Sequence, residues 1–216
     1  MPPGLSAFRL DPRADVFAQA RLLADSHGAG SLFWSCDPER LCLAVVLEPE
    51  EPLGEARRAV YLGMLAVCDA LAPAAPPERP IRIRWPATLL VDGAVAGGGR
   101  LAWPEAALEQ EPPAWLVFGA ALRLSWPVTF EPGNAPGRTA LAEEGFELDP
   151  VALVESFARH LLFHGDAWAT GGFDAMARAY ARLLDPPGRV DAQGDLAQGK
   201  YPLAARLLAP DWLEAA

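Results

Sequence analysis

Four short strand-like runs in the middle of the chain constrain its fold more than any other feature. They cover residues 81–85, 89–91, 95–103 and 115–124. Asp92-Gly93 joins the middle two runs and is a strong signal for a two-residue hairpin turn. Successive strands joined by short turns form a meander, so we expect an antiparallel sheet in this region.

Helix-like patterns flank this sheet on both sides. Upstream, apolar residues recur at every third or fourth position over 11–27 and 52–71, and a hairpin is expected from 32–34 and 41–47. Downstream, helices are expected over 150–163 and 172–184. Helices gathered at both ends of such a sheet indicate an α+β fold with a mixed, mostly antiparallel sheet.

The domain organisation follows from where this pattern stops. We expect one domain over residues 1–184. Residues 185–216 are rich in Gly and Pro at first and end in a weakly amphipathic piece, so we expect a C-terminal tail or small appendage there. The sequence gives no role for this tail around Lys200.

Charge and hydropathy exclude several classes of protein. The net charge of -10 and the pI near 4.8 disfavour nucleic acid as a partner. The apolar run 114–122 is too short to cross a membrane, and no secretory signal is visible, so a cytoplasmic protein is expected. Of the 18 basic residues one, Lys200, is lysine and 17 are arginine, which is typical of a GC-rich bacterial genome.

The stretch 84–97 carries the most specific signal. It reads RWPATLLVDGAVAG and resembles the hallmark of the biotin/lipoate protein ligase family, Lys/Arg-Trp-Pro-Asn-Asp, a short strand, a turn, and Lys-hydrophobic-Ala/Ser-Gly. Residues 115–123 are similar to a later strand of that family, and the resemblance extends over about residues 8–184. It implies the biotin protein ligase fold, with a core like that of class II aminoacyl-tRNA synthetases. The activity it implies is ATP-dependent activation of a carboxylic acid, followed by transfer to a lysine on a carrier domain.

The residues that would stabilise phosphate in such a ligase are missing. Ala94 stands at the lysine position, Ala87-Thr88 replaces Asn-Asp, and Arg123 replaces an adenylate-contacting asparagine. Only residues 35–40 are present where the family has an Arg/Gly-rich loop. Losing one preorganised donor costs on the order of 10²–10³ in rate. We therefore expect a pseudoenzyme that is degenerate for adenylation, with no assigned catalytic residue.

A binding role is the expectation that follows. We expect a pocket on the concave face of the sheet, where glycines permit close approach, aromatic rings bury an apolar tail and arginines meet a carboxylate. Its predicted ligand-binding residues are Trp34, Arg84, Trp85, Gly97, Gly98 and Arg123. Biotin, lipoate and acyl-adenylates are the candidate ligands, a biotinyl or lipoyl carrier domain is the candidate protein partner, and a homodimer is left open. The alternative is an active acyl or biotinyl transferase with a non-standard site.

A histidine pair, a cysteine and a run of glycines could each have a structural role instead of a functional one. His160 and His164 have metal-ligand spacing on a helix, but a packed pair is favoured and no metal site is predicted. Cys36, in a turn, is the most plausible nucleophile among three cysteines, but no lysine lies near it in the sequence. The glycines 97–99 either admit a ligand or relieve crowding at a bulge, and both explanations stay open.

Overall fold

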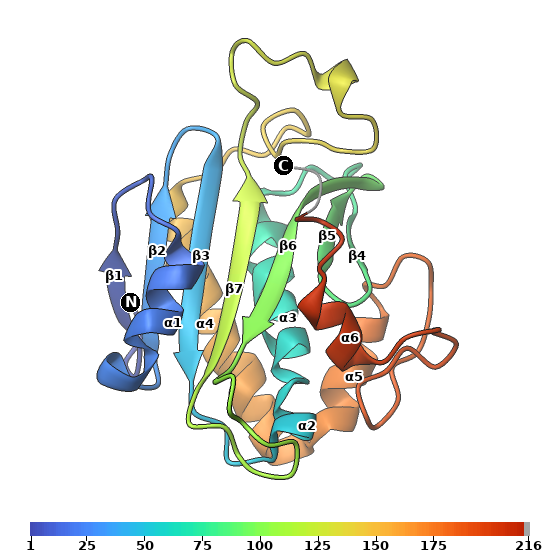
Figure 1. Ribbon diagram of the computed structural model, residues 1–216. Coiled ribbons are helices and arrows are strands. Elements are labelled where there is room, and N and C mark those ends of the chain that lie inside the picture. Colours follow the sequence, from blue (N-terminus) through green and yellow to red (C-terminus); the bar gives the residue numbers. More distant parts are fainter. Residues whose placement is uncertain (214–216) are drawn as a thin grey trace.

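A seven-stranded sheet forms the centre of the molecule in the computed structural model, which describes residues 1–213 (Figure 1). The strand order is β1-β2-β3-β7-β6-β5-β4. β1 runs parallel to β2 and every other neighbouring pair is antiparallel. The predicted α+β fold with a mixed, mostly antiparallel sheet is confirmed. The strands are β1 (Ser6–Arg9), β2 (Ser31–Cys36), β3 (Arg40–Leu47), β4 (Ile81–Arg84), β5 (Thr88–Val91), β6 (Ala94–Ala102) and β7 (Leu116–Arg123).

Helices lie on both faces of this sheet. In Figure 1, α3 and α4 lie behind it, whereas α1 and α6 lie in front, on either side of an uncovered stretch of β7 and β6. The helices are α1 (Val16–His27), α2 (Leu53–Ala56), α3 (Ala59–Leu71), α4 (Pro150–Gly171), α5 (Phe173–Ala181) and α6 (Leu203–Leu208), with 3-10 turns at Ala72–Ala74 and Pro132–Asn134. No helix within residues 1–213 is long and apolar enough to span a membrane.

The main core lies between the sheet and the helices α3, α4 and α5. Helix α3 is buried almost all round because it lies between the sheet and α4. Gly63 permits the closest approach: a Cβ atom there would lie 2.4 Å from the ring of Phe118 on β7. Phe118 in turn stacks on Phe157 of α4, with ring centroids 6.2 Å apart.

A smaller core lies on the other face, under α1. Asp15 caps this helix, because its Oδ1 accepts a hydrogen bond of 3.0 Å from the Ala18 amide. Val16 and Phe17 pack with residues of β2, β3 and β7. The predicted start of the helix at Asp11 is wrong, since the side chain that satisfies the first amides of the helix belongs to Asp15.

Three other predicted elements differ in the structure. The helix expected over 52–71 is interrupted between α2 and α3. Helix α4 continues past residue 163, the expected end, and through Gly165 to Gly171, and Trp168 in this added part packs against the main core. Strand β1 was not predicted, because four exposed residues give no periodic burial signal.

Residues 185–213 pack against the rest of the chain. The Tyr61 hydroxyl donates to the Gly194 carbonyl, and Leu203 and Leu207 of α6 are buried in the main core. We call residues 203–213 the C-terminal strap. The division into a domain over 1–184 and a tail stays a prediction, and the strap is the part of that tail that reaches the sheet.

Candidate functional site

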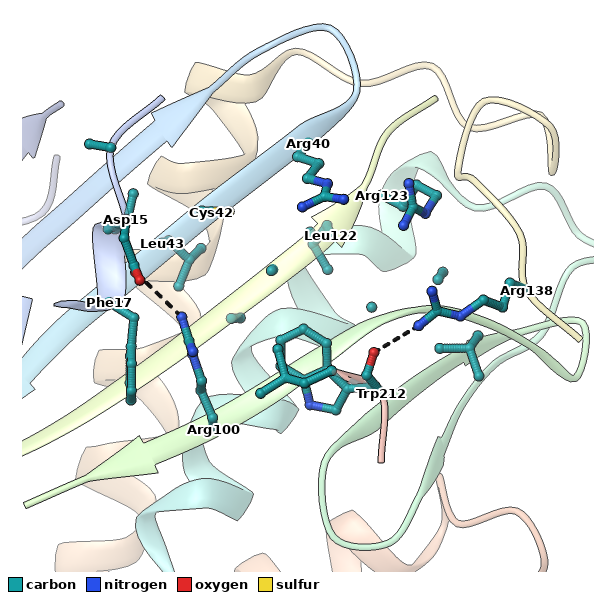
Figure 2. A pocket seen from close by; sticks show the side chains of 18 of the residues that line it. Asp15, Phe17, Arg40, Cys42, Leu43, Arg100, Leu122, Arg123, Arg138 and Trp212 are labelled. Atoms are coloured by element: carbon teal, nitrogen blue, oxygen red, sulfur yellow. Dashed lines mark hydrogen bonds and ion pairs between the residues drawn. The ribbon is translucent and has the colours of Figure 1, made fainter. Parts of the chain in front are cut away.

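A cavity of about 320 Å³ opens on the face of the sheet that carries α1 (Figure 2). Its floor is formed by β3, β7 and β6, one wall by the first residues of α1, and the opposite wall by the C-terminal strap. Cavities that hold small ligands in proteins measure about 300–1,000 Å³. The size therefore suits a small organic molecule.

Small side chains make the floor of this cavity flat. Ala121 of β7 is paired with Cys42 of β3 on one side and with Gly98 of β6 on the other, so these three residues project from the same face of the sheet. Gly97, which precedes Gly98 in β6, also lines the cavity. A ligand can lie close to the backbone here, because no long side chain stands between β3 and β6.

The wall made by the strap depends on one tryptophan. The Trp212 indole Nε1–H donates to the Gly99 carbonyl at 2.9 Å, and the side chain is buried. A Cβ atom at Gly98 would lie 2.4 Å from Trp212 Cδ1. The absence of a side chain at Gly98 is therefore what lets the strap lie on the sheet beside the cavity.

Arginines dominate the charge of the cavity. Its lining contains a single carboxylate, Asp15, beside five arginines: Arg13, Arg40, Arg100, Arg123 and Arg138. Asp15 is paired with Arg100 at 3.6 Å. Burial lowers the pKa of Arg100, and the Asp15 charge opposes that shift. The cavity is thus cationic in a protein whose net charge is -10.

Arg40, Arg123 and Arg138 gather at the end of the cavity away from Asp15 (Figure 2), and we call them the arginine triad. Burial lowers the pKa of Arg123, the charges of Arg40 and Arg138 lower it further, and the Glu39 charge opposes the shift in part. Burial and the charge of Arg40 likewise lower the pKa of Arg138. The three cations thus lie close enough to repel one another, and an anion between them would relieve that repulsion.

The structure does not bring the six predicted site residues together. Gly97 and Arg123 line the cavity, and Gly98 lies under Trp212 beside it. Arg84 is on the edge strand β4, three strands from β7 and so about 14 Å away at the usual strand spacing. The prediction that Arg84 and Arg123 lie together in one site is therefore wrong.

The two predicted aromatic residues belong to the main core on the other face of the sheet. Trp34 is buried there with its cross-strand partner Leu43. Trp85 is also buried, and its Nε1–H donates to the Tyr61 hydroxyl at 2.8 Å. The prediction that both rings line the pocket is wrong. Trp34 points from β2 to the face of the main core, and Trp85, in the turn after β4, is held in that core by its hydrogen bond to Tyr61.

Most lining residues were not predicted from the sequence as parts of the site, among them Asp15, Arg40, Arg138 and Trp212. Arg40 is the first residue of β3 and pairs with Arg123, the last residue of β7. Two arginines at the ends of neighbouring strands were the available signal, and it required knowing that β3 and β7 are adjacent. Arg138 and Trp212 lie outside any periodic pattern.

Thiols and imidazoles contribute little reactive chemistry. Burial raises the pKa of Cys36, and Asp37 raises it further, so the thiolate is disfavoured. Burial also raises the pKa of Cys42, on the cavity floor. His164 Nε2 lies 2.6 Å from Asp69 Oδ2 of α3. Within residues 1–213, no group of three or more His, Cys, Asp or Glu side chains is arranged to hold a metal ion.

The mixed seven-stranded sheet packed with helices matches the catalytic-domain fold of biotin protein ligases. A model of the biotin/lipoate A/B protein ligase family matches residues 1–182, and the chain belongs to this family. No curated protein matches the chain.

Solved structures of biotin protein ligases share the fold. A biotin protein ligase-like protein of unknown function from Silicibacter sp. TM1040 is 26% identical, with a TM-score of 0.83 over 95% of this chain and 97% of that one. The apo biotin protein ligase of Aquifex aeolicus is 15% identical, with a TM-score of 0.70 over 89% and 90% of the two chains. The Leishmania major biotin protein ligase in complex with biotinyl-5-AMP is 12% identical, with a TM-score of 0.63 over 94% and 98%.

Proposed function

We propose that this protein binds a small organic acid, biotin-like or acyl in type, in the cavity on the α1 face, and that it does not adenylate it. The arginine triad beside a floor of small side chains is the observation that carries the proposal. An apolar body fits against the floor, and an anionic group meets the guanidinium N–H donors.

The missing phosphate-gripping residues support the second half of the proposal. β2 and β3 are joined by Asp37, Pro38 and Glu39 alone. Asp37 Oδ1 accepts hydrogen bonds from the amides of Glu39 at 2.8 Å and Arg40 at 2.7 Å, which closes the turn tightly. No loop that could wrap a triphosphate leaves this hairpin, and β6 begins with Ala94 in the family's lysine position.

An active transferase has less support. A covalent acyl transfer needs an activated nucleophile. Cys42 is the thiol that lines the cavity, and burial raises its pKa. Lys200, the sole lysine of the chain, is not among the lining residues. The binding role therefore fits the site better than group transfer.

The test compares binding with turnover. Thermal unfolding is measured with biotin, lipoate and octanoate, since a ligand that binds the native state raises the Tm. We expect at least one acid to raise the Tm of the wild type and of Arg159→Gln, a control at an exposed position on α4 across the sheet. The shift should disappear in Arg123→Gln.

Pyrophosphate release with ATP and each acid is measured in parallel. We expect no release above background, and an Ala94→Lys variant should also show none, because the hairpin loop is absent as well. Release by the wild type would contradict the loss of adenylation. A Tm unchanged by all three acids would contradict acid binding.

A further inference from the structure

The placement of the arginine triad is unfavourable for the free protein. Arg40 and Arg123 are direct partners in the β3–β7 register. Like charges directly opposite one another across two strands destabilise a sheet. Arg138, from the loop after β7, adds a third charge to the same end of the cavity. A purely structural role does not explain why three cations are gathered there.

Carboxylate partners are plentiful in this chain, yet the triad has none. The sequence contains 28 Asp and Glu residues against 18 Lys and Arg. Arg57, Arg79 and Arg206 each form an ion pair with a carboxylate. In the same part of the chain, residues 1–213, no member of the triad does so.

Two members of the triad are held in place by uncharged groups, and the Glu39 carboxylate offsets the charge of Arg123 only in part and without forming an ion pair. The Arg123 guanidinium lies over the Trp126 ring, 4.4 Å from its centroid. Arg138 Nη2–H donates to the Trp212 carbonyl at 2.8 Å. An uncharged ring and a carbonyl fix the two side chains without neutralising them. The remaining N–H donors are thus preorganised for an external anion.

From this geometry we infer that the ligand carries a doubly charged head group, a terminal phosphate, held by Arg40, Arg123 and Arg138. A carboxylate brings one negative charge and two oxygens to three cations, whereas a phosphate monoester brings nearly two charges and three acceptor oxygens. The apolar part of the same molecule lies over the floor of small residues at Ala121 and Gly97. This inference rests on the proposed function, because it names the ligand class of the same cavity.

The experiment uses two probes with the same eight-carbon chain, octyl phosphate and octanoate, and measures binding by titration calorimetry at pH 7.5. We expect octyl phosphate to bind the wild type about tenfold more tightly or better, as one additional charge-assisted contact provides. Arg40→Gln and Arg138→Gln should each weaken octyl phosphate about tenfold and octanoate much less. Arg159→Gln should bind both probes as the wild type does.

The pH dependence gives a second readout that a structural role for the arginines would not produce. The second pKa of a phosphate monoester is about 6, whereas a carboxylate is ionised from about pH 5 upward. The preference for octyl phosphate over octanoate should therefore grow between pH 5 and pH 7.5. A preference that stays constant over this range overturns the inference.

The outcomes separate this inference from the proposed function. Octanoate binding as tightly as octyl phosphate overturns the phosphate head group and leaves acid binding intact. Failure of both probes, together with biotin and lipoate, overturns both proposals. A soluble ester and a lipid head group share the inferred chemistry. Sedimentation with phosphatidylcholine vesicles that contain or lack phosphatidic acid distinguishes these two sources.

Discussion

The two faces of the sheet differ in what their side chains do. The face under α3 and α4 buries large rings, and hydrogen bonds hold several of their polar atoms: Tyr180 Oη donates to the Pro86 carbonyl at 2.7 Å, and Trp85 donates to Tyr61. The face that carries α1 combines small side chains, a cavity and three arginines, the arginine triad, that form no ion pair with a carboxylate within residues 1–213. The proposed site thus lies on the face with the smaller core, so we expect its residues to tolerate substitution better than those of the main core.

The largest expected effect comes from a ring on the α3 face. Phe118→Ala should lower the free energy of unfolding by about 3–5 kcal/mol, because it removes a fully buried ring between Gly63 and Phe157. Chemical denaturation measures the loss. Val117→Ala, the neighbour that points toward α1, is the matched control and should cost clearly less. An equal loss from both variants would break the contrast between the two faces.

A smaller effect is expected from the hydroxyl of Tyr61. Tyr61→Phe leaves the Trp85 indole N–H and the Gly194 carbonyl without their partner. Unsatisfied buried polar groups cost about 1–3 kcal/mol, so the denaturation midpoint should fall accordingly. Tyr201→Phe, at an exposed position, serves as the control. A Tyr61→Phe protein as stable as the wild type would mean that this network contributes nothing.

A substitution in the arginine triad should affect ligand binding strongly and the free energy of unfolding little, whereas a substitution in the core does the reverse. Arg123→Gln should abolish ligand binding and leave the free energy of unfolding within about 0.5 kcal/mol of the wild type, or raise it, because it removes repulsion from Arg40. Denaturation without ligand measures this. A loss above about 1.5 kcal/mol would show that Arg123 supports the fold.

The smallest effect concerns an arginine that does have a partner. Arg57 holds Glu109 in a two-pronged ion pair, which lowers the pKa of that carboxyl below its usual value. A lowered pKa in the folded state contributes stability above the unfolded pKa of about 4.3, and this contribution is lost as the pH falls through the folded value.

Glu109 is more than half exposed, so solvent screening limits this contribution to a few tenths of a kcal/mol. The fall in unfolding free energy from pH 7 to pH 3 should be smaller in Glu109→Gln by that amount. Identical pH profiles for the two proteins would show that the pair contributes nothing to stability.

Local sequence patterns were sufficient to predict most strands of the sheet, but not the order of the strands or the site. The turn at Asp92-Gly93 predicts the β5–β6 hairpin from local sequence alone. The cavity depends on which strands are neighbours: Arg40 meets Arg123 only because β7 inserts beside β3, with β6 on its other side. One sequence does not give that order, nor the face to which Trp34 and Trp85 point. The α1 start and the passage of α4 through Gly165 were likewise decided by a cap and by tertiary packing.

Trp212 gives the protein an optical reporter at its own cavity. The indole lines the wall beside Gly98 and Arg138, and its emission depends on the polarity and hydration of what lies against it. The chain contains seven tryptophans, so the difference spectrum between the wild type and Trp212→Phe isolates this one. Binding in the cavity can thus be followed by intrinsic tryptophan fluorescence, without a label and before the ligand is known.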